Sequence, residues 1–110
     1  MSWLAVPAWL VLLIAPAAAQ ATGELAEQER RGEAQLTRLC ARCHAVGRTG
    51  AGPHAEAPAF RTLGRRYPIE SLEEALGEGL LSGHPDMPEF TFTADEVGDV
   101  IAYLNAIQER

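Results

Sequence analysis

The side chains best suited to chemistry stand together in one short stretch, RLCARCHAVG, at residues 38–47. It contains the only two cysteines of the chain, Cys40 and Cys43, and His44 follows the second cysteine directly. Thiol and imidazole groups at this spacing can ligate a metal ion, form a redox-active disulfide or attach a cofactor. The rest of the chain must decide among these three uses.

The pattern favours cofactor attachment. A structural zinc site needs about four protein ligands, and only His54 and His84 remain as further histidines. A thioredoxin-like disulfide belongs in a βαβ context, which this sequence does not show. Cys-x-x-Cys followed directly by His is the pattern of covalent c-type haem attachment. In that interpretation Cys40 and Cys43 bond to the edge of the porphyrin, and His44 is the proximal iron ligand.

Three segments with helical periodicity must position these side chains, and little in the sequence predicts strand. The first predicted helix covers residues 24–40, with Thr22 as its cap. The second covers residues 69–82, where Ser71 begins a capping box. The third follows Thr93, which begins a second capping box, and continues to Ile107. We therefore expect an all-α fold.

Two irregular stretches separate these helices. Residues 47–68 are rich in Gly, Pro and Ala and have no clean period. The second stretch, residues 83–92 (GHPDMPEFTF), is shorter and includes Met87, which two prolines stiffen. A long structureless loop in a small domain is uncommon unless it wraps around something. Because a chain of this size has a marginal core of its own, we expect helices and loops to enclose the cofactor.

The amino-terminal segment predicts export. Residues 1–19 contain no charged side chain and end in small residues, as a secretory signal does before cleavage, here at Ala19/Gln20. Residues 20–110 would then be the single mature domain, in the periplasm. A retained membrane anchor is the alternative, since the stretch approaches the roughly 20 residues that span a bilayer. Export agrees with haem attachment, because c-type haem is attached outside the cytoplasm.

The charge distribution argues against a nucleic-acid partner. The chain has a net charge of −6 and no lysine, whereas phosphate binding needs a basic surface. Eight of the nine arginines lie in residues 20–66 and ten of the fifteen acids in residues 67–110. This asymmetry predicts an electric dipole that could steer the molecule toward a charged partner.

In their order along the chain, these motifs make the sequence similar to the small soluble class I cytochromes c, over essentially all of residues 20–110. The likeness rests on CARCH, on Gly32, Leu36 and Cys40 at the spacing of that family's N-terminal helix, and on VIAYLNAI in the last helix. HPDMPEF resembles the ligand loop of short bacterial members. The resemblance implies a cytochrome c fold with three main helices and two irregular loops around one covalent haem.

The resemblance also implies roles for single residues. Met87 would be the second iron ligand, with His84 as its rival and His54 as a remoter one. The carbonyl of Pro53 would accept a hydrogen bond from the imidazole of His44. Gly32 would let the last helix cross the first closely, through Val100, Tyr103 or Leu104. The candidates for packing against the porphyrin are Phe60, Leu63, Tyr67, Leu76 and Phe90.

With His44 and Met87 on the iron, the resemblance implies a monohaem single-electron carrier rather than an enzyme. It would meet donor and acceptor proteins in brief encounters. One alternative is a haem enzyme or gas sensor with a displaceable distal ligand. Another is the cytochrome subunit of a larger dehydrogenase complex. The candidate charges for partner encounters are Arg42, Arg48, Arg65 and Arg66.

Overall fold

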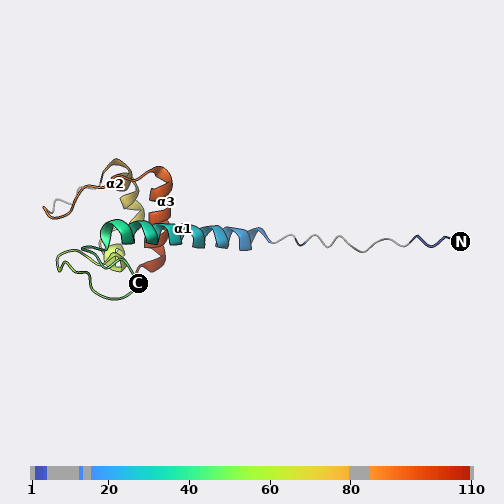
Figure 1. Ribbon diagram of the computed structural model, residues 1–110, viewed down its shortest axis with the longest axis horizontal. Coiled ribbons are helices and arrows are strands. Elements are labelled where there is room, and N and C mark those ends of the chain that lie inside the picture. Colours follow the sequence, from blue (N-terminus) through green and yellow to red (C-terminus); the bar gives the residue numbers. More distant parts are fainter. Residues whose placement is uncertain (1, 5–12, 14–15, 80–84, 110) are drawn as a thin grey trace.

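The computed structural model describes residues 2–4, 13, 16–79 and 85–109. Within these residues the secondary structure is helical, without a strand, which confirms the all-α prediction. Helix α1 extends beyond the packed body toward the amino terminus, and α2 and α3 lie across its other end (Figure 1). The elements in chain order are α1 (Ala17–Cys40), the 3₁₀ helices η1 (Phe60–Arg65) and η2 (Ile69–Ser71), α2 (Leu72–Glu78) and α3 (Ala94–Ile107).

Helices α1 and α3 come from opposite ends of the chain and cross at Gly32. A Cβ atom on Gly32 would lie 2.1 Å from the carbonyl oxygen of Asp99 and 3.0 Å from Cβ of Tyr103. Beside the crossing, the guanidinium of Arg31 donates to both carboxylate oxygens of Asp99 at 2.9 and 3.0 Å. The predicted close approach at Gly32 is confirmed, and it is made by Tyr103 and by the backbone of Asp99.

The core lies along this crossing and continues into the segment that follows Cys43. Tyr103 is buried, and its hydroxyl donates to the carbonyl of Val46 at 2.9 Å. This hydrogen bond ties α3 directly to the residues after His44. The core residues contributed by the three α-helices include Leu36, Leu76, Val100, Ile101, Leu104 and Ile107.

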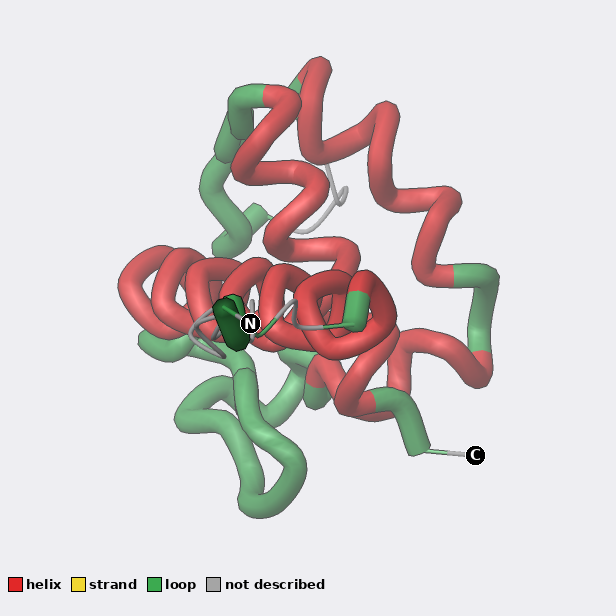
Figure 2. Tube along the Cα trace, turned by 90° about the vertical axis from the view of Figure 1, so that its right-hand side faces the viewer, coloured by secondary structure: helices red, strands yellow, loops and turns green. Residues whose placement is uncertain are grey.

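Two residues after α3 form what we call the C-terminal clamp, Gln108 and Glu109. The side-chain amide of Gln108 donates to the carbonyl of Phe60 at 2.8 Å, and its oxygen accepts from the backbone N–H of Gly64 at 2.7 Å. The backbone N–H of Glu109 donates to the carbonyl of Arg61 at 2.8 Å. The clamp therefore fixes η1 against the end of α3. Figure 2 views the molecule along α1, with the carboxyl-terminal end of the chain beside the helical body.

Helix α1 begins earlier than predicted. It starts at Ala17 because the run from there to Ala21 is mostly alanine, the residue with the highest helix propensity. Thr22 is not its cap: the Thr22 hydroxyl donates to the carbonyl of Ala18 at 2.9 Å inside the helix. The predicted cleavage site, Ala19/Gln20, lies in the first turn of α1, and most of residues 1–19 lie outside the described residues.

The helix predicted over residues 69–82 is shorter and divided. It consists of η2 and α2 and ends at Glu78, because Gly79 adopts φ +116°, which cannot continue a helix. The capping box at Ser71 is wrong: Ser71 itself has helical angles, φ −63° and ψ −14°, so its hydroxyl makes no cap hydrogen bond. The remaining predicted residues, 80–82, lie outside the described part of the chain.

The third predicted helix is confirmed at its start. Thr93 caps α3 by accepting from the backbone N–H of Glu96 at 3.3 Å. The carboxylate of Glu96 accepts instead from the side-chain amide of Gln35 at 2.5 Å, across the contact between α1 and α3. Among the helices described, none combines the length and the apolar character that crossing a bilayer requires.

Candidate cofactor site

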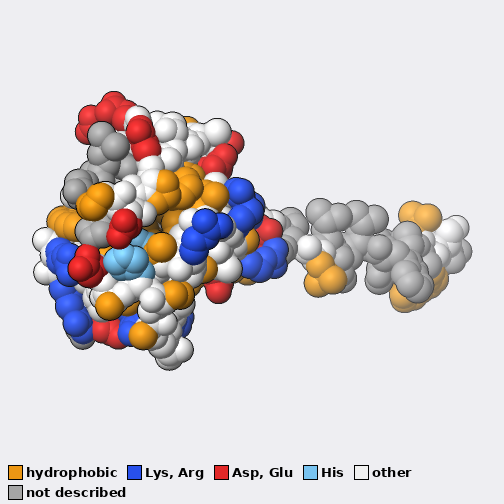
Figure 3. Space-filling view, turned by 60° about the vertical axis from the view of Figure 1, so that its left-hand side comes forward, with side chains coloured by type: hydrophobic (Ala, Val, Ile, Leu, Met, Phe, Trp, Pro, Cys, Tyr) orange, Lys and Arg blue, Asp and Glu red, His pale blue; other side chains and the backbone are white. Residues whose placement is uncertain are grey.

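A cleft of about 950 Å³ lies between the end of α1, η1 and the loop that carries Met87. This volume is at the upper end of the roughly 300–1,000 Å³ of small-molecule sites. On the face shown in Figure 3, histidine atoms lie among hydrophobic and charged side chains. The cleft lining includes eight residues that the sequence analysis expected to attach, ligate or pack against the cofactor: Cys40, Cys43, His44, Phe60, Leu63, Tyr67, Met87 and Phe90.

The end of α1 sets the position of the two thiols and the imidazole. Cys40 is the last residue of α1, and the chain turns tightly after it. The backbone N–H groups of Cys43 and His44 both donate to the carbonyl of Cys40, at 3.1 and 2.9 Å. This turn brings both sulfur atoms and the imidazole to one wall of the cleft.

His44 is held in a defined orientation. Its Nδ1 lies 2.7 Å from the carbonyl oxygen of Pro58, and because a carbonyl can only accept, Nδ1 carries the proton and donates. The ring of Phe60 packs against the imidazole with 4.6 Å between ring centroids. Nε2 of the neutral ring is therefore left with an available lone pair.

The prediction that Pro53 accepts this hydrogen bond is wrong, and the loop path explains why. The loop after His44 first folds back against the turn at Cys43, where the backbone N–H of His54 donates to the carbonyl of Cys43 at 3.2 Å. Only after this contact does the loop pass beside the imidazole of His44. Pro53 lies on the exposed side of this excursion, while Pro58 lies on the returning side. Sequence spacing alone does not distinguish two prolines in one irregular segment.

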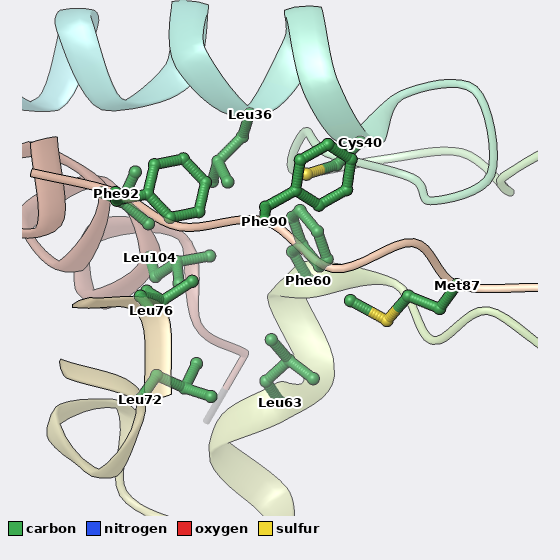
Figure 4. Close-up of a pocket in the computed structure, with 11 residues that line it drawn as sticks. Leu36, Cys40, Phe60, Leu63, Leu72, Leu76, Met87, Phe90, Phe92 and Leu104 are labelled. Carbon is green, nitrogen blue, oxygen red and sulfur yellow. The ribbon is translucent and has the colours of Figure 1, made fainter. Parts of the chain in front are cut away.

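Met87 reaches the cleft from the opposite side. Its side chain is half-buried and also lines a deeper cavity of about 60 Å³. In Figure 4 the Met87 side chain extends from its loop toward Phe60 and Leu63. Leu76, predicted to pack against the porphyrin, lines this deeper cavity and not the main cleft. The rival residue His84 lies outside the described part of the structure.

The electrostatics of the cysteine pair do not favour a thiol–disulfide function. Burial, with a smaller effect from Cys43, raises the pKa of the Cys40 thiol to about 11. Redox-active Cys-x-x-Cys pairs depend instead on a lowered thiol pKa. In the described ranges, no three His, Cys, Asp or Glu side chains gather into a group that could hold a metal ion.

The four arginines proposed for partner contacts separate into two pairs. Arg42 and Arg66 line the cleft. Arg48 donates to the carbonyl of Ala106 at 2.9 Å, and Arg65 pairs with Glu109 at 2.5 Å, so both make contacts within the fold. Several lining residues were not predicted from the sequence, among them Pro58, Asp86 and Arg38, which stands four residues before Arg42.

Comparison with known proteins identifies the class of this site. Residues 27–104 match the family described as cytochrome c oxidase, cbb3-type, subunit III. The chain is also 33% identical over 98 residues to cytochrome c-552 of Bradyrhizobium diazoefficiens, covering 89% of this chain and 92% of that relative. No solved structure matches the chain. The chain belongs to the small class I c-type cytochromes.

This cytochrome therefore binds one haem c covalently and carries electrons. The cleft fits that group, because two thiols, an imidazole with an available nitrogen and a thioether line a single cavity of suitable volume. The match covers α1 from its first partly buried residues, beginning at residue 27, through α3 to Leu104. It includes the helix crossing, both loops and the whole cleft.

Proposed function

We propose that this cytochrome transfers single electrons between redox partner proteins, with its haem held by thioether bonds from Cys40 and Cys43 and ligated by His44 and Met87. The observation that supports this most strongly is the convergence of these four side chains on one cleft. When bound, haem c supplies one-electron chemistry at its iron. The surrounding residues set the conditions for that chemistry.

His44 serves as a pre-oriented proximal ligand in this proposal. The hydrogen bond from Nδ1 to the carbonyl of Pro58 fixes the tautomer and increases the basicity of Nε2. Phe60 restricts rotation of the ring from one side. A ligand held in this way keeps its place in both oxidation states, so little rearrangement accompanies transfer.

Met87 and the apolar walls favour the reduced state. A thioether ligand raises the reduction potential of haem iron. The apolar wall contributed by Leu63 and Phe90 lowers the local dielectric and restricts water. With His44 and Met87 both held as its ligands, the haem would exchange electrons without binding a substrate.

An optical experiment tests this assignment. We expect the oxidised protein to show the weak far-red sulfur-to-iron band, and the reduced protein not to bind carbon monoxide. Spectra of both states, recorded with and without carbon monoxide, measure this directly. Ready binding of carbon monoxide by the unmodified protein would contradict the carrier and favour the enzyme or sensor with a displaceable ligand.

The proposed site of action is the periplasm, after cleavage at Ala19/Gln20. The first residues of α1, 17–26, are exposed, and the family match begins only at residue 27. Among the described residues, cleavage in the first turn therefore removes only exposed side chains. We expect the protein from the periplasmic fraction to begin at Gln20 on amino-terminal sequencing; a protein that begins at Met1 and fractionates with membranes would identify a retained anchor.

The family description names an oxidase subunit, which makes a subunit of a larger redox complex a second candidate. Electron relay within this chain would be the same in that case. The size of the native protein in a mild extract distinguishes the two: a species no larger than a single chain, which has a mass of 11.9 kDa before cleavage, indicates a separate carrier.

A further inference from the structure

His54 makes a polar contact across the mouth of the cleft. Its Nδ1 lies 3.2 Å from the backbone nitrogen of Glu56, and because a backbone N–H can only donate, Nδ1 is the acceptor. The neutral ring therefore carries its proton on Nε2. That nitrogen lies 3.4 Å from a carboxylate oxygen of Asp86, so His54 donates a charge-assisted hydrogen bond to the loop that carries Met87.

The segment around His54 is firmly attached to the wall that bears the cysteines. The backbone N–H of His54 donates to the carbonyl of Cys43, and its carbonyl accepts from Ala57 at 3.1 Å. Two residues earlier, a Cβ atom on Gly52 would lie 2.5 Å from the carbonyl oxygen of Cys43. The backbone that carries the imidazole of His54 is therefore held in place against Cys43.

The loop that carries Met87, on the side of the cleft facing His54, has few backbone N–H donors. Pro85 and Pro88 lack an N–H group, and they enclose Asp86 and Met87. Contacts made by side chains therefore contribute a larger share of what holds this loop. His54, Asp86 and Met87 all line the same cleft, and Figure 3 shows acidic side chains beside the histidine atoms on this face.

We infer that His54 is a positioning residue that holds the Met87 loop across the cleft through Asp86, and so limits how readily Met87 leaves the iron. This rests on the proposed function, in which Met87 is the distal ligand. The side chain of Asp86 is 68% exposed and that of His54 30% exposed. For a pair so accessible to solvent, we expect an effect of up to about fivefold on ligand displacement.

Displacement of Met87 by imidazole tests the inference, with loss of the far-red sulfur-to-iron band as the readout. We expect His54→Ala and Asp86→Ala each to bind imidazole more tightly and faster than the unmodified protein, by up to about fivefold. The double variant should bind imidazole as tightly and as fast as either single variant, because each substitution removes the same hydrogen bond between His54 and Asp86. His54→Gln, which retains a side-chain N–H donor, should restore part of the resistance.

Thr49→Ala is the matched control, since Thr49 is exposed in the same loop, and it should leave imidazole binding unchanged. Unaltered displacement in both single variants, with the band intact, would overturn the inference. Additive effects in the double variant would also overturn it, since the two residues would then act separately. Absence of the band from the unmodified protein would instead refute the proposed ligation by Met87.

Discussion

Replacement of Met87 by alanine is expected to abolish the far-red sulfur-to-iron band and to allow the reduced protein to bind carbon monoxide. The Met87 side chain lines the same cleft as His44, and alanine at this position has no group that could reach the iron. Because a methionine ligand raises the potential of haem iron, the reduction potential of Met87→Ala should also fall. Optical spectroscopy and a redox titration measure the two effects.

Met87→Leu separates ligation from packing in the same experiment. Leucine nearly conserves the volume of methionine and usually costs less than about 1.5 kcal/mol, but it has no sulfur. We expect Met87→Leu to lose the band as completely as Met87→Ala, while retaining more of the stability that contact with Phe60 and Leu63 provides. A band that survives in either variant would show that the distal ligand is another residue.

Replacement of Gly32 by alanine is expected to destabilise the protein by about 3 kcal/mol or to prevent folding, the upper end of the usual cost of overpacking. The added Cβ atom would lie 2.1 Å from the carbonyl oxygen and 2.6 Å from the carbonyl carbon of Asp99. Both are backbone atoms of α3, so no side-chain rotation relieves the clash. Helices α1 and α3 would have to separate, together with the core between them.

Gly98→Ala is the control for Gly32→Ala. Gly98 precedes Asp99 on α3, and a Cβ atom there would meet nothing within 4 Å. We expect this substitution to stabilise the protein by about 0.5–1 kcal/mol, the usual preference for alanine over glycine inside a helix. Chemical denaturation of the two variants and the parent measures both changes. Equal stability of Gly32→Ala and the parent would contradict the tight crossing.

The features that local pattern determines were predictable from the sequence. Spacing alone identified Cys40, Cys43 and His44, and the helical pattern after Thr93 matched α3 at its start and end. The resemblance to a known family added Gly32, whose crossing with α3 the structure confirms.

Features that depend on distant parts of the chain were not predictable. The choice of Pro58 over Pro53 follows from the path of a loop that has no periodicity. Arg48 and Arg65 looked available until their contacts at the other end of the chain were known. No sequence pattern related His54 to its partner Asp86, which stands 32 positions later. In each case the contact partner is distant in the sequence and becomes a neighbour only in the folded chain.

The C-terminal clamp has a consequence for the order in which the cleft is assembled. The cysteines and His44 are synthesised in the first half of the chain, but η1, which carries the Phe60 ring beside His44, is held by Gln108 and Glu109. Because haem attachment follows export, the thiols of a chain that crosses the membrane amino terminus first are exposed before those two residues arrive. The wall behind His44 is complete only once the carboxyl-terminal residues have bonded to η1.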